Sequence, residues 1–227
     1  MAGDLDVYDF SARRTAVASG MTVVSVDYRR SPEAPFPLGL TDTYQVLRHL
    51  EEVLVDVTTS GRIHAVADSG GAAKLASIAM RVAAGEWESP IERQVLMYPS
   101  LDYTMSGESI TTFGSGYFLD AERVAWYFDN YFPTGTNRAA ASPILGPIDQ
   151  NMPETLVIAA EYDPLLSEAQ EYVRRVQDAG SSAELLVAPG MIHAYMFFEK
   201  FVPDVVDQTY RVLSDFLQTG TAQWTRS

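Results

Sequence analysis

The sequence predicts an α/β fold in which a mainly parallel sheet carries helices on both faces. Strand-like runs alternate along the chain with segments whose apolar residues recur every three or four positions. The strand-like runs are nearly continuous in apolar residues, as is typical of parallel strands buried on both sides. With 227 residues, of which 47% are hydrophobic, the chain can build one substantial core, so we expect a single domain over 1–227.

The first part of the chain predicts a helix, a strand, a rigid loop and a second helix. The helix covers 8–19 and ends at Gly20, which favours a left-handed C-cap. Residues 21–28 are rich in β-branched residues and predict a buried strand. The three prolines within 31–37 fix the backbone and forbid regular pairing, so this stretch predicts a loop before a long helix over 38–57.

The rest of the chain continues the alternation of strands and helices. We expect strands at 62–67, 93–98, 155–160 and 184–187, and helices at 72–84, from an N-cap near Asp120, after Asp163 until Gly180, and at 206–218. The stretch between Ser100 and Asn137 is rich in loops. We interpret the region around 101–140 as a cap-like insertion, with an ordinary loop as the equal alternative.

Composition excludes several classes of function. A formal net charge of −14 disfavours nucleic acids and anionic membrane surfaces as partners. The absence of cysteine excludes disulfides, thiolate metal sites and cysteine nucleophiles. The sequence shows no signal peptide and no apolar run long enough to span a membrane, so we expect a cytoplasmic protein. No motif implies a cofactor or a metal.

Three residues in the order Ser, Asp, His are the candidates for a catalytic triad. Ser69, Asp163 and His193 each follow a predicted strand closely. Because the carboxyl ends of parallel strands share one edge of the sheet, we expect these side chains to converge there. A serine hydroxyl is a weak nucleophile alone, and it needs a base to take its proton and an acid to orient that base.

Each candidate also has a simpler interpretation. Ser69 and Asp163 could cap the helices that follow them, and His193 could be a buried histidine with satisfied hydrogen bonds. The strand before Ser69 and the presence of both partners favour the triad. The turn at Ser69 needs small residues two positions before and after it, because strand and helix approach closely there. Ala67 and Gly71 occupy these positions.

Four motifs in the same order resemble those of the hormone-sensitive-lipase-like group of α/β-hydrolases, which are carboxylesterases and lipases. Residues 26–29 with Pro32-Glu33 and 35–37 resemble that group's V-D-Y-R-x-x-P-E-x-P-F-P segment. Residues 68–71 resemble the G-D-S-A-G-G elbow, 163–165 the D-P-L acid motif, and 189–193 the P-G-x-x-H-x-F histidine motif. The resemblance runs from about Gly3 to about Phe198 and implies an α/β-hydrolase fold.

The resemblance implies a role for each candidate residue. Ser69 is the expected nucleophile, His193 the general base and then acid, and Asp163 the residue that orients His193. The backbone N–H of Gly70, the residue after the nucleophile, is the expected oxyanion donor. The aromatic run after His193 offers Tyr195 and Phe197 as substrate-binding residues, with simple core packing as the alternative.

The sequence departs from the group's pattern at its beginning. The group carries an H-G-G-G motif upstream, whose glycine amides complete the oxyanion hole, and no such motif occurs here. We therefore expect a fold that lacks its N-terminal strands, and we hypothesise that Met1 is an internal start within a longer gene product. In the intact fold a third strand separates the strands expected at 21–28 and 62–67. Without it, these two strands pair directly, leave a gap, or receive a strand from another chain.

The sequence therefore predicts a serine carboxylesterase that hydrolyses small apolar esters through an acyl-enzyme intermediate. We expect its activity to fall on acidification, because a protonated His193 cannot accept the proton of the serine. The alternative is a catalytically impaired remnant or binding module that lacks part of the oxyanion hole, and a hydrolase-fold lyase or transferase is a third option. A small ester is the expected partner, and an unpaired sheet edge also favours a homo-oligomer.

Overall fold

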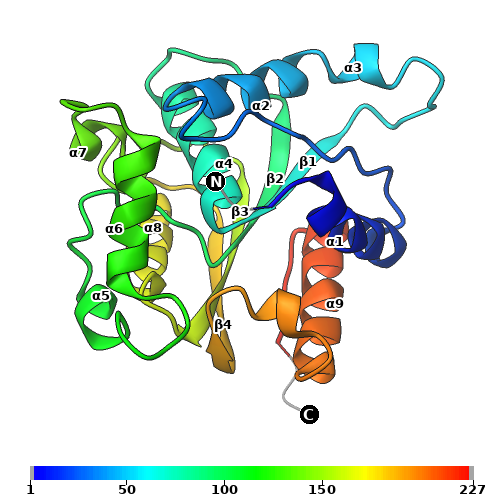
Figure 1. Ribbon diagram of the computed structural model, residues 1–227. Coiled ribbons are helices and arrows are strands. Elements are labelled where there is room, and N and C mark those ends of the chain that lie inside the picture. The colour runs from blue at the N-terminus through cyan, green and yellow to red at the C-terminus, as the bar shows by residue number, and fades with distance from the viewer. Residues whose placement is uncertain (1–2, 225–227) are drawn as a thin grey trace.

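The computed structural model describes residues 3–224 and shows a parallel sheet enclosed by helices (Figure 1). Within these residues the sheet has four strands, and their order in space is their order along the chain: β1 (Ile63–Asp68), β2 (Ile91–Met97), β3 (Glu154–Tyr162) and β4 (Ala183–Ile192). Each neighbouring pair is parallel. Since β1 pairs only with β2, it forms one edge of the sheet.

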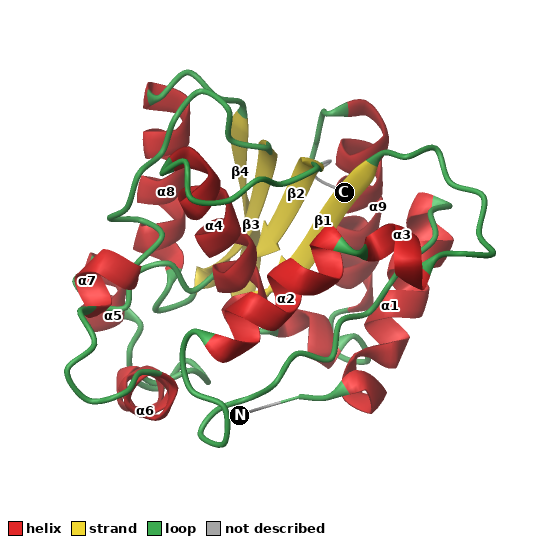
Figure 2. Cartoon of the chain, turned by 90° about the horizontal axis from the view of Figure 1, so that it is seen from above, coloured by secondary structure: helices red, strands yellow, loops and turns green. Residues whose placement is uncertain are grey.

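Helices cover both faces of this sheet (Figure 2). One face carries α2 (Leu38–Arg48), α4 (Ser69–Ala83) and α8 (Leu166–Asp178), and the other carries α1 (Leu5–Ser19) and α9 (Pro203–Thr219). The shorter helices lie in the connections: α3 (Leu50–Val53), α5 (Glu108–Thr112), α6 (Ala121–Tyr131), α7 (Arg138–Ala141) and the 3₁₀ turn η1 (Tyr195–Phe198). The α/β fold predicted from the sequence, with a parallel sheet between helices, is confirmed.

Strand β3 shows how the two layers are built from one apolar run. Leu156 and Ile158 pack in the core on the side of α9, whereas Val157 and Ala159 pack in the core on the side of α4 and α8. All four residues are at most 1% exposed. Because successive strand residues point to opposite faces, a strand covered by helices on both sides must be apolar throughout.

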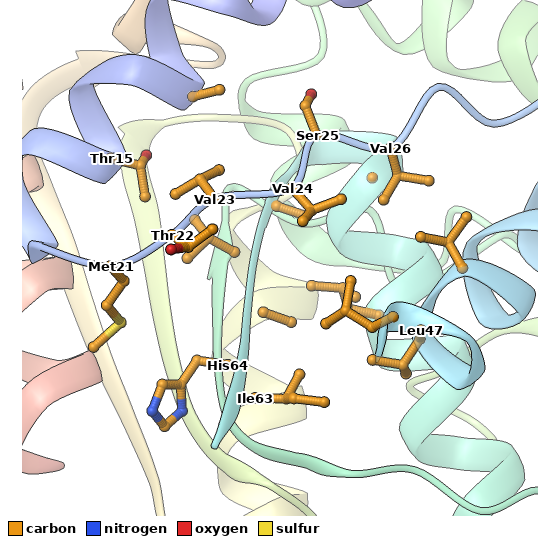
Figure 3. A pocket seen from close by; sticks show the side chains of 18 of the residues that line it. Thr15, Met21, Thr22, Val23, Val24, Ser25, Val26, Leu47, Ile63 and His64 are labelled. Carbon is orange, nitrogen blue, oxygen red and sulfur yellow. The ribbon is translucent and has the colours of Figure 1, made fainter. Parts of the chain in front are cut away.

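The strand expected at 21–28 is wrong. The segment follows the left-handed cap at Gly20 and runs without helix or strand pairing to the loop at 31–34. A strand exists only where a partner lies within hydrogen-bonding distance. Of the three outcomes considered for this segment, the structure shows the gap: a cavity of about 850 Å³ separates it from β1 (Figure 3).

The long helix expected over 38–57 is shorter than predicted. It ends at Arg48, because the backbone of His49 leaves the helical region, and α3 adds only a short turn. Val53 ends that turn, and Val55 and Val57 follow it. Because β-branched residues lose side-chain freedom in a helix, these valines disfavour its continuation. The other expected helices and strands are present, with ends that differ by a few residues. Strand β4 is longer than expected and runs through Pro189 and Gly190 to Ile192.

Helix α2 contacts its neighbours through two residues near its middle. Asp42 accepts three hydrogen bonds from Arg29, one from its backbone and two from its guanidinium, at 2.7–3.0 Å. Further along, Tyr44 stacks on Trp87 with ring centroids 4.0 Å apart, and the guanidinium of Arg81 lies 4.8 Å from the Trp87 ring. The first contact holds α2 to the segment before it, and the second holds α2 to α4 through Trp87.

The region 101–140 has a hydrophobic cluster of its own. Its members are Ala73, Tyr103, Leu119, Val124, Phe128, Phe132 and Leu165. Ala73 lies on α4 and Leu165 directly precedes α8, so the cluster joins α6 to the helical layer on that face. Asp120 occupies the N-cap position of α6 as expected, but its side chain accepts a hydrogen bond from the N–H of Gly116 rather than from the helix. No helix in residues 3–224 has the length and apolar character that a membrane span requires.

Candidate active site

The three candidate triad residues lie together at the carboxyl edge of the sheet. Ser69 directly follows β1, Asp163 directly follows β3, and His193 directly follows β4. The Oγ of Ser69 lies 3.0 Å from Nε2 of His193, and Nδ1 of His193 lies 2.8 Å from Oδ2 of Asp163. A carboxylate only accepts, so Nδ1 carries a proton, and Nε2 is left to accept the serine proton. The three side chains therefore form a hydrogen-bonded series from Ser69 through His193 to Asp163.

The turn that carries Ser69 is strained and tightly packed. The φ angle of Ser69 is 45°, in the left-handed region that residues other than glycine rarely adopt. A methyl group added to Gly71 would lie 3.4 Å from the Cβ of Ala67. This distance shows why small residues are needed on both sides of the serine, and that alanine at position 67 still fits. The turn presents Oγ at the sheet edge, where the first turn of α4 begins.

Gly70 lies at the start of α4, where backbone N–H groups have no partner within the helix. The residue is exposed, and a methyl group added to it would meet no atom within 4 Å. The N-terminal end of a helix also favours negative charge through its dipole. The Gly70 amide thus lies in the first turn of α4, beside Ser69, with open space around it.

Asp163 is fixed by two hydrogen bonds. It is 1% exposed, and its Oδ1 accepts from the N–H of Leu165 at 2.9 Å while Oδ2 faces His193. One side chain thus supports the turn before α8 and orients the imidazole. His193 is also buried, at 5% exposed, and the ring of Tyr98 packs edge-on against it with centroids 5.0 Å apart. Asp163 and His193 are therefore each held in one orientation.

Asp68, beside the candidate nucleophile, contacts two tyrosines that the sequence did not connect with it. Its Oδ2 accepts from the hydroxyls of Tyr8 at 3.3 Å and of Tyr98 at 3.4 Å. Burial raises the pKa of Asp68, while the nearby His193 and the two tyrosine hydroxyls oppose that rise. Burial also raises the pKa of Tyr28 to about 12, with Asp68 adding to the effect. Asp68 links α1, β1 and β2 beneath the site.

Glu168 is a second residue whose role the sequence did not indicate. It lies in α8, is 2% exposed, and accepts a hydrogen bond from the N–H of Leu101 at 2.6 Å. Burial raises its pKa well above the usual value, and the carboxylates of Asp102 and Asp163 add to this effect. Glu168 therefore connects α8, which begins just after Asp163, to Leu101 at the start of the region 101–140.

The two aromatic residues expected at a substrate pocket have different surroundings. Tyr195 is 1% exposed and belongs to the core on the side of α9, where its hydroxyl lies 2.7 Å from Oγ1 of Thr209. This position matches the core alternative considered for it. Phe197 is 45% exposed, and its ring meets that of Tyr8 edge-on at 5.3 Å. Only Phe197 of this pair offers an apolar surface to solvent.

Lys74 is a buried cation in α4, in the helical turn that follows Ser69. It is 8% exposed, its Nζ donates to the carbonyl of Gly70 at 3.2 Å, and it lies 4.1 Å from the centre of the Tyr28 ring. Burial lowers the pKa of Lys74 to about 8. Among residues 3–224, no carboxylate lies within salt-bridge distance of it. Within the same residues, no three His, Asp or Glu side chains are grouped so that they could hold a metal ion.

The comparisons with known proteins agree with this geometry. A family model described as the alpha/beta hydrolase fold matches residues 1–197. The chain belongs to the α/β-hydrolase fold family. It is 31% identical over 199 residues to the ethyl acetate hydrolase of Pseudomonas putida, covering 86% of this chain and 63% of that one. It is 30% identical over 217 residues to the carboxylesterase NlhH of Mycobacterium tuberculosis, covering 93% of this chain and 68% of that one.

Solved structures of an esterase and an ester hydrolase superpose on nearly the whole of this chain. The hyperthermophilic esterase of the archaeon Pyrobaculum calidifontis superposes with a TM-score of 0.88 at 29% identity, covering 97% of this chain and 73% of that one. An ester hydrolase from the metagenome of Lake Arreo superposes with a TM-score of 0.87 at 29% identity, covering 96% of this chain and 70% of that one. This α/β-hydrolase chain spans about two thirds of the length of the curated relatives that it matches.

Proposed function

We propose that this α/β-hydrolase chain is a serine carboxylesterase that hydrolyses small apolar esters. The observation that carries the proposal is the hydrogen-bonded series of Ser69, His193 and Asp163. Ser69 Oγ lies 3.0 Å from His193 Nε2, and His193 Nδ1 lies 2.8 Å from Asp163 Oδ2. The curated relatives from P. putida and M. tuberculosis are named as ester hydrolases, which supports the same reaction class.

In the first half-reaction Ser69 forms the acyl-enzyme. Its Oγ bonds to the ester carbonyl carbon while Nε2 of His193 takes the hydroxyl proton. Asp163 holds the imidazole and stabilises the positive charge that forms on it. The tetrahedral intermediate then breaks its bond to the alcohol oxygen, which leaves with the proton that His193 returns to it.

In the second half-reaction water releases the acid. His193 takes a proton from water as the water oxygen bonds to the acyl carbon. The second tetrahedral intermediate breaks its bond to Oγ, and the proton on His193 returns to Ser69. The Gly70 amide donates to the oxyanion in both intermediates. Removing one such donor costs on the order of 10²–10³ in rate, so loss of the Gly70 donation should slow the reaction by about that factor.

The surroundings of the site favour apolar, uncharged substrates. Phe197, Phe118 and Tyr117 present partly exposed rings near the carboxyl edge, and Phe118 meets Phe198 edge-on at 5.2 Å. We propose that the region 101–140 covers the site as a cap, because Phe113 and Tyr117 pack on Tyr162 at the carboxyl end of β3. The name of the P. putida relative points to short acyl and alcohol groups. The cytoplasmic location and the homo-oligomer expected from the sequence stay predictions.

The test is hydrolysis of p-nitrophenyl acetate by the chain and by Ser69→Ala. We expect the substitution to reduce the rate to near that of the buffer, because Ser69 is the hydroxyl that lies within hydrogen-bonding distance of Nε2 of His193. The matched control is Ser60→Ala, at an exposed serine near the amino end of β1, and it should keep the full rate. A fluorophosphonate probe should label Ser69 in the folded chain and not in heat-unfolded chain.

Equal and near-background rates from the folded unmodified chain and the folded Ser69→Ala variant would contradict the proposal. The chain would then be the impaired hydrolase or binding module considered above, which the relatives named as ester hydrolases do not favour.

A further inference from the structure

A short helix of the region 101–140 contacts the turn that carries the acid of the triad. Helix α5 begins directly after Gly107, and Ser109 in its first turn faces the start of α8. A methyl group added to Gly107 would overlap Oγ of Ser167, so the two segments approach as closely as a glycine allows. Ser109 is buried in this contact. The contact therefore places a buried hydroxyl against the turn between β3 and α8.

The hydroxyl of Ser109 uses its full hydrogen-bonding capacity in this contact. Its Oγ lies 2.6 Å from the carbonyl oxygen of Pro164, which can only accept, so the hydroxyl proton points there. Oγ then accepts from the N–H of Ser167 at 3.0 Å and from the hydroxyl of Ser167, 2.8 Å away. One donated and two accepted hydrogen bonds leave this oxygen no further capacity. The hydroxyl therefore has one fixed orientation.

The carbonyl that Ser109 binds belongs to the peptide group that holds the acid of the triad. A peptide group comprises the carbonyl of one residue and the N–H of the next, in one plane. The carbonyl of Pro164 and the N–H of Leu165 are therefore the two ends of a single rigid unit. Its N–H donates to Oδ1 of Asp163 at 2.9 Å, and Oδ2 of Asp163 lies 2.8 Å from Nδ1 of His193. A fixed hydroxyl at one end of this unit thus fixes the direction of the donor at the other end.

The hydrogen bond from Leu165 restrains the carboxylate of Asp163. Rotation about the bond to a carboxyl group is broad, and the Leu165 N–H opposes it on the side of Oδ1. A hydrogen bond accepted by a carbonyl also polarises its peptide group and strengthens the N–H as a donor. Ser109 therefore acts on Asp163 in two ways, through the direction and through the strength of the same hydrogen bond.

The segment before Ser109 is itself anchored, so the hydroxyl has a stable support. At the beginning of this segment, the N–H of Leu101 donates to the buried Glu168 of α8 at 2.6 Å. The adjacent Asp102 accepts four hydrogen bonds from the loop that follows it, at 2.5–2.9 Å. The segment is thus joined to α8 at both of its ends.

We propose that Ser109 is a positioning residue of the esterase, which holds Asp163 in the orientation that serves His193. The inference rests on the proposed function, because the orientation of Asp163 matters only in a working triad. Ser109 does not touch the reacting atoms and acts through the peptide group that lies between it and the acid. The region 101–140, proposed above as a cap, thereby also supports the acid.

Steady-state hydrolysis of p-nitrophenyl acetate by the full chain and by Ser109→Ala tests the proposal. We expect kcat to fall by about tenfold, because a displacement of the acid by about 1 Å would cost roughly 10²-fold and a smaller shift costs less. KM should change by less than about twofold. His193 serves both half-reactions, so acylation and deacylation slow together, and Ser109 does not touch the substrate.

Ser167→Ala is the matched control. It removes the other hydroxyl of the same contact but leaves the hydrogen bond from Ser109 to the Pro164 carbonyl in place. Both variants should lower the urea midpoint of unfolding, because each removes buried hydrogen bonds. Only Ser109→Ala should lower kcat. A merely structural role for Ser109 predicts instead that kcat falls in both variants alike.

Proton NMR gives a readout that needs no substrate. The proton on Nδ1 of His193 lies in a charge-assisted hydrogen bond of 2.8 Å to Asp163, and such protons resonate far downfield of amide protons. We expect this signal to move upfield or to broaden through faster exchange with water in Ser109→Ala, and to stay in place in Ser167→Ala. Ser109→Cys carries a weaker donor and should show the same change, so it replaces the alanine variant if that variant does not fold.

Two results would overturn the proposal. The first is an unchanged kcat together with an unchanged resonance in a folded Ser109 variant. The second is an equal loss of kcat in Ser109→Ala and Ser167→Ala. Both differ from a failure of the proposed function. If the unmodified chain hydrolysed no ester, the resonance would still report whether Ser109 orients Asp163. An active chain that is silenced by Ser69→Ala but unaffected by Ser109→Ala would contradict this inference alone.

Discussion

At the residue scale, two charged residues near Ser69, Asp68 and Lys74, are each contacted by a tyrosine from a distant part of the chain. Ser69, Asp163 and His193 could be predicted from their motifs and from the rule that parallel strands end at one edge. Asp68 and Lys74 sit beside the same serine, but the groups that face them come from distant parts of the chain. No spacing within the sequence brings Tyr8 or Tyr28 to these side chains, so their burial could only be learned from the structure.

Replacement of Lys74 by methionine tests the cost of burying this cation. The pKa of lysine is ordinarily 10.5, and burial lowers that of Lys74 to about 8. Between these values the unfolded chain binds a proton that the folded chain has released, so the free energy of unfolding rises with pH. Lys74→Met should lack that rise and should be more stable at neutral pH by up to about 3 kcal/mol. Urea unfolding across this pH window measures both effects.

Lys200 provides the control, because it is exposed and is the other lysine of the chain. Lys200→Met should keep the pH dependence of the unmodified protein. Identical pH dependence in the Lys74 variant would show that the cation–π contact with Tyr28 and the bond to the Gly70 carbonyl compensate its burial fully.

At the element scale, β1 and α4 approach each other closely at the turn between them, near Ala67 and Gly71. The expected helices and strands could be predicted because their apolar periods are local properties of the sequence. The failure at 21–28 has the opposite cause: a β-branched run can form a strand only beside a partner, and pairing is decided by the rest of the fold. The same run is nevertheless extended and half-buried on alternate residues, which include Val24, Val26 and Tyr28.

Substitutions of Gly71 test the packing between β1 and α4. Alanine adds a methyl group at an acceptable 3.4 Å from Ala67 and removes a glycine from a helix, so Gly71→Ala should change the free energy of unfolding little. Gly71→Val places a further carbon against the strand and should destabilise the fold by about 1–3 kcal/mol. Thermal unfolding of the two variants gives the comparison, and equal midpoints would show that the turn adapts to added volume.

At the scale of the whole molecule, the sheet is narrower than the two helical layers that cover it. The helices on both faces reach past β1, whereas the sheet ends there. The sequence could predict that something separates 21–28 from β1, because the resemblance placed a strand between them. It could not predict that the space stays open, which depends on the anchoring of α1 by α9 and of Arg29 by Asp42.

The stacking of Tyr44 on Trp87 has a practical consequence for optical measurements. The pair joins α2 to the segment just after α4, and α2 lines one side of the cavity beside β1. The emission of an indole changes when an aromatic ring or a guanidinium leaves its face, and Arg81 lies beside the same ring. Trp126 is half-exposed on α6, in a different part of the molecule. The intrinsic fluorescence of Trp87, compared with a Trp87→Phe background, therefore reports whether α2 shifts relative to α4, without any attached dye.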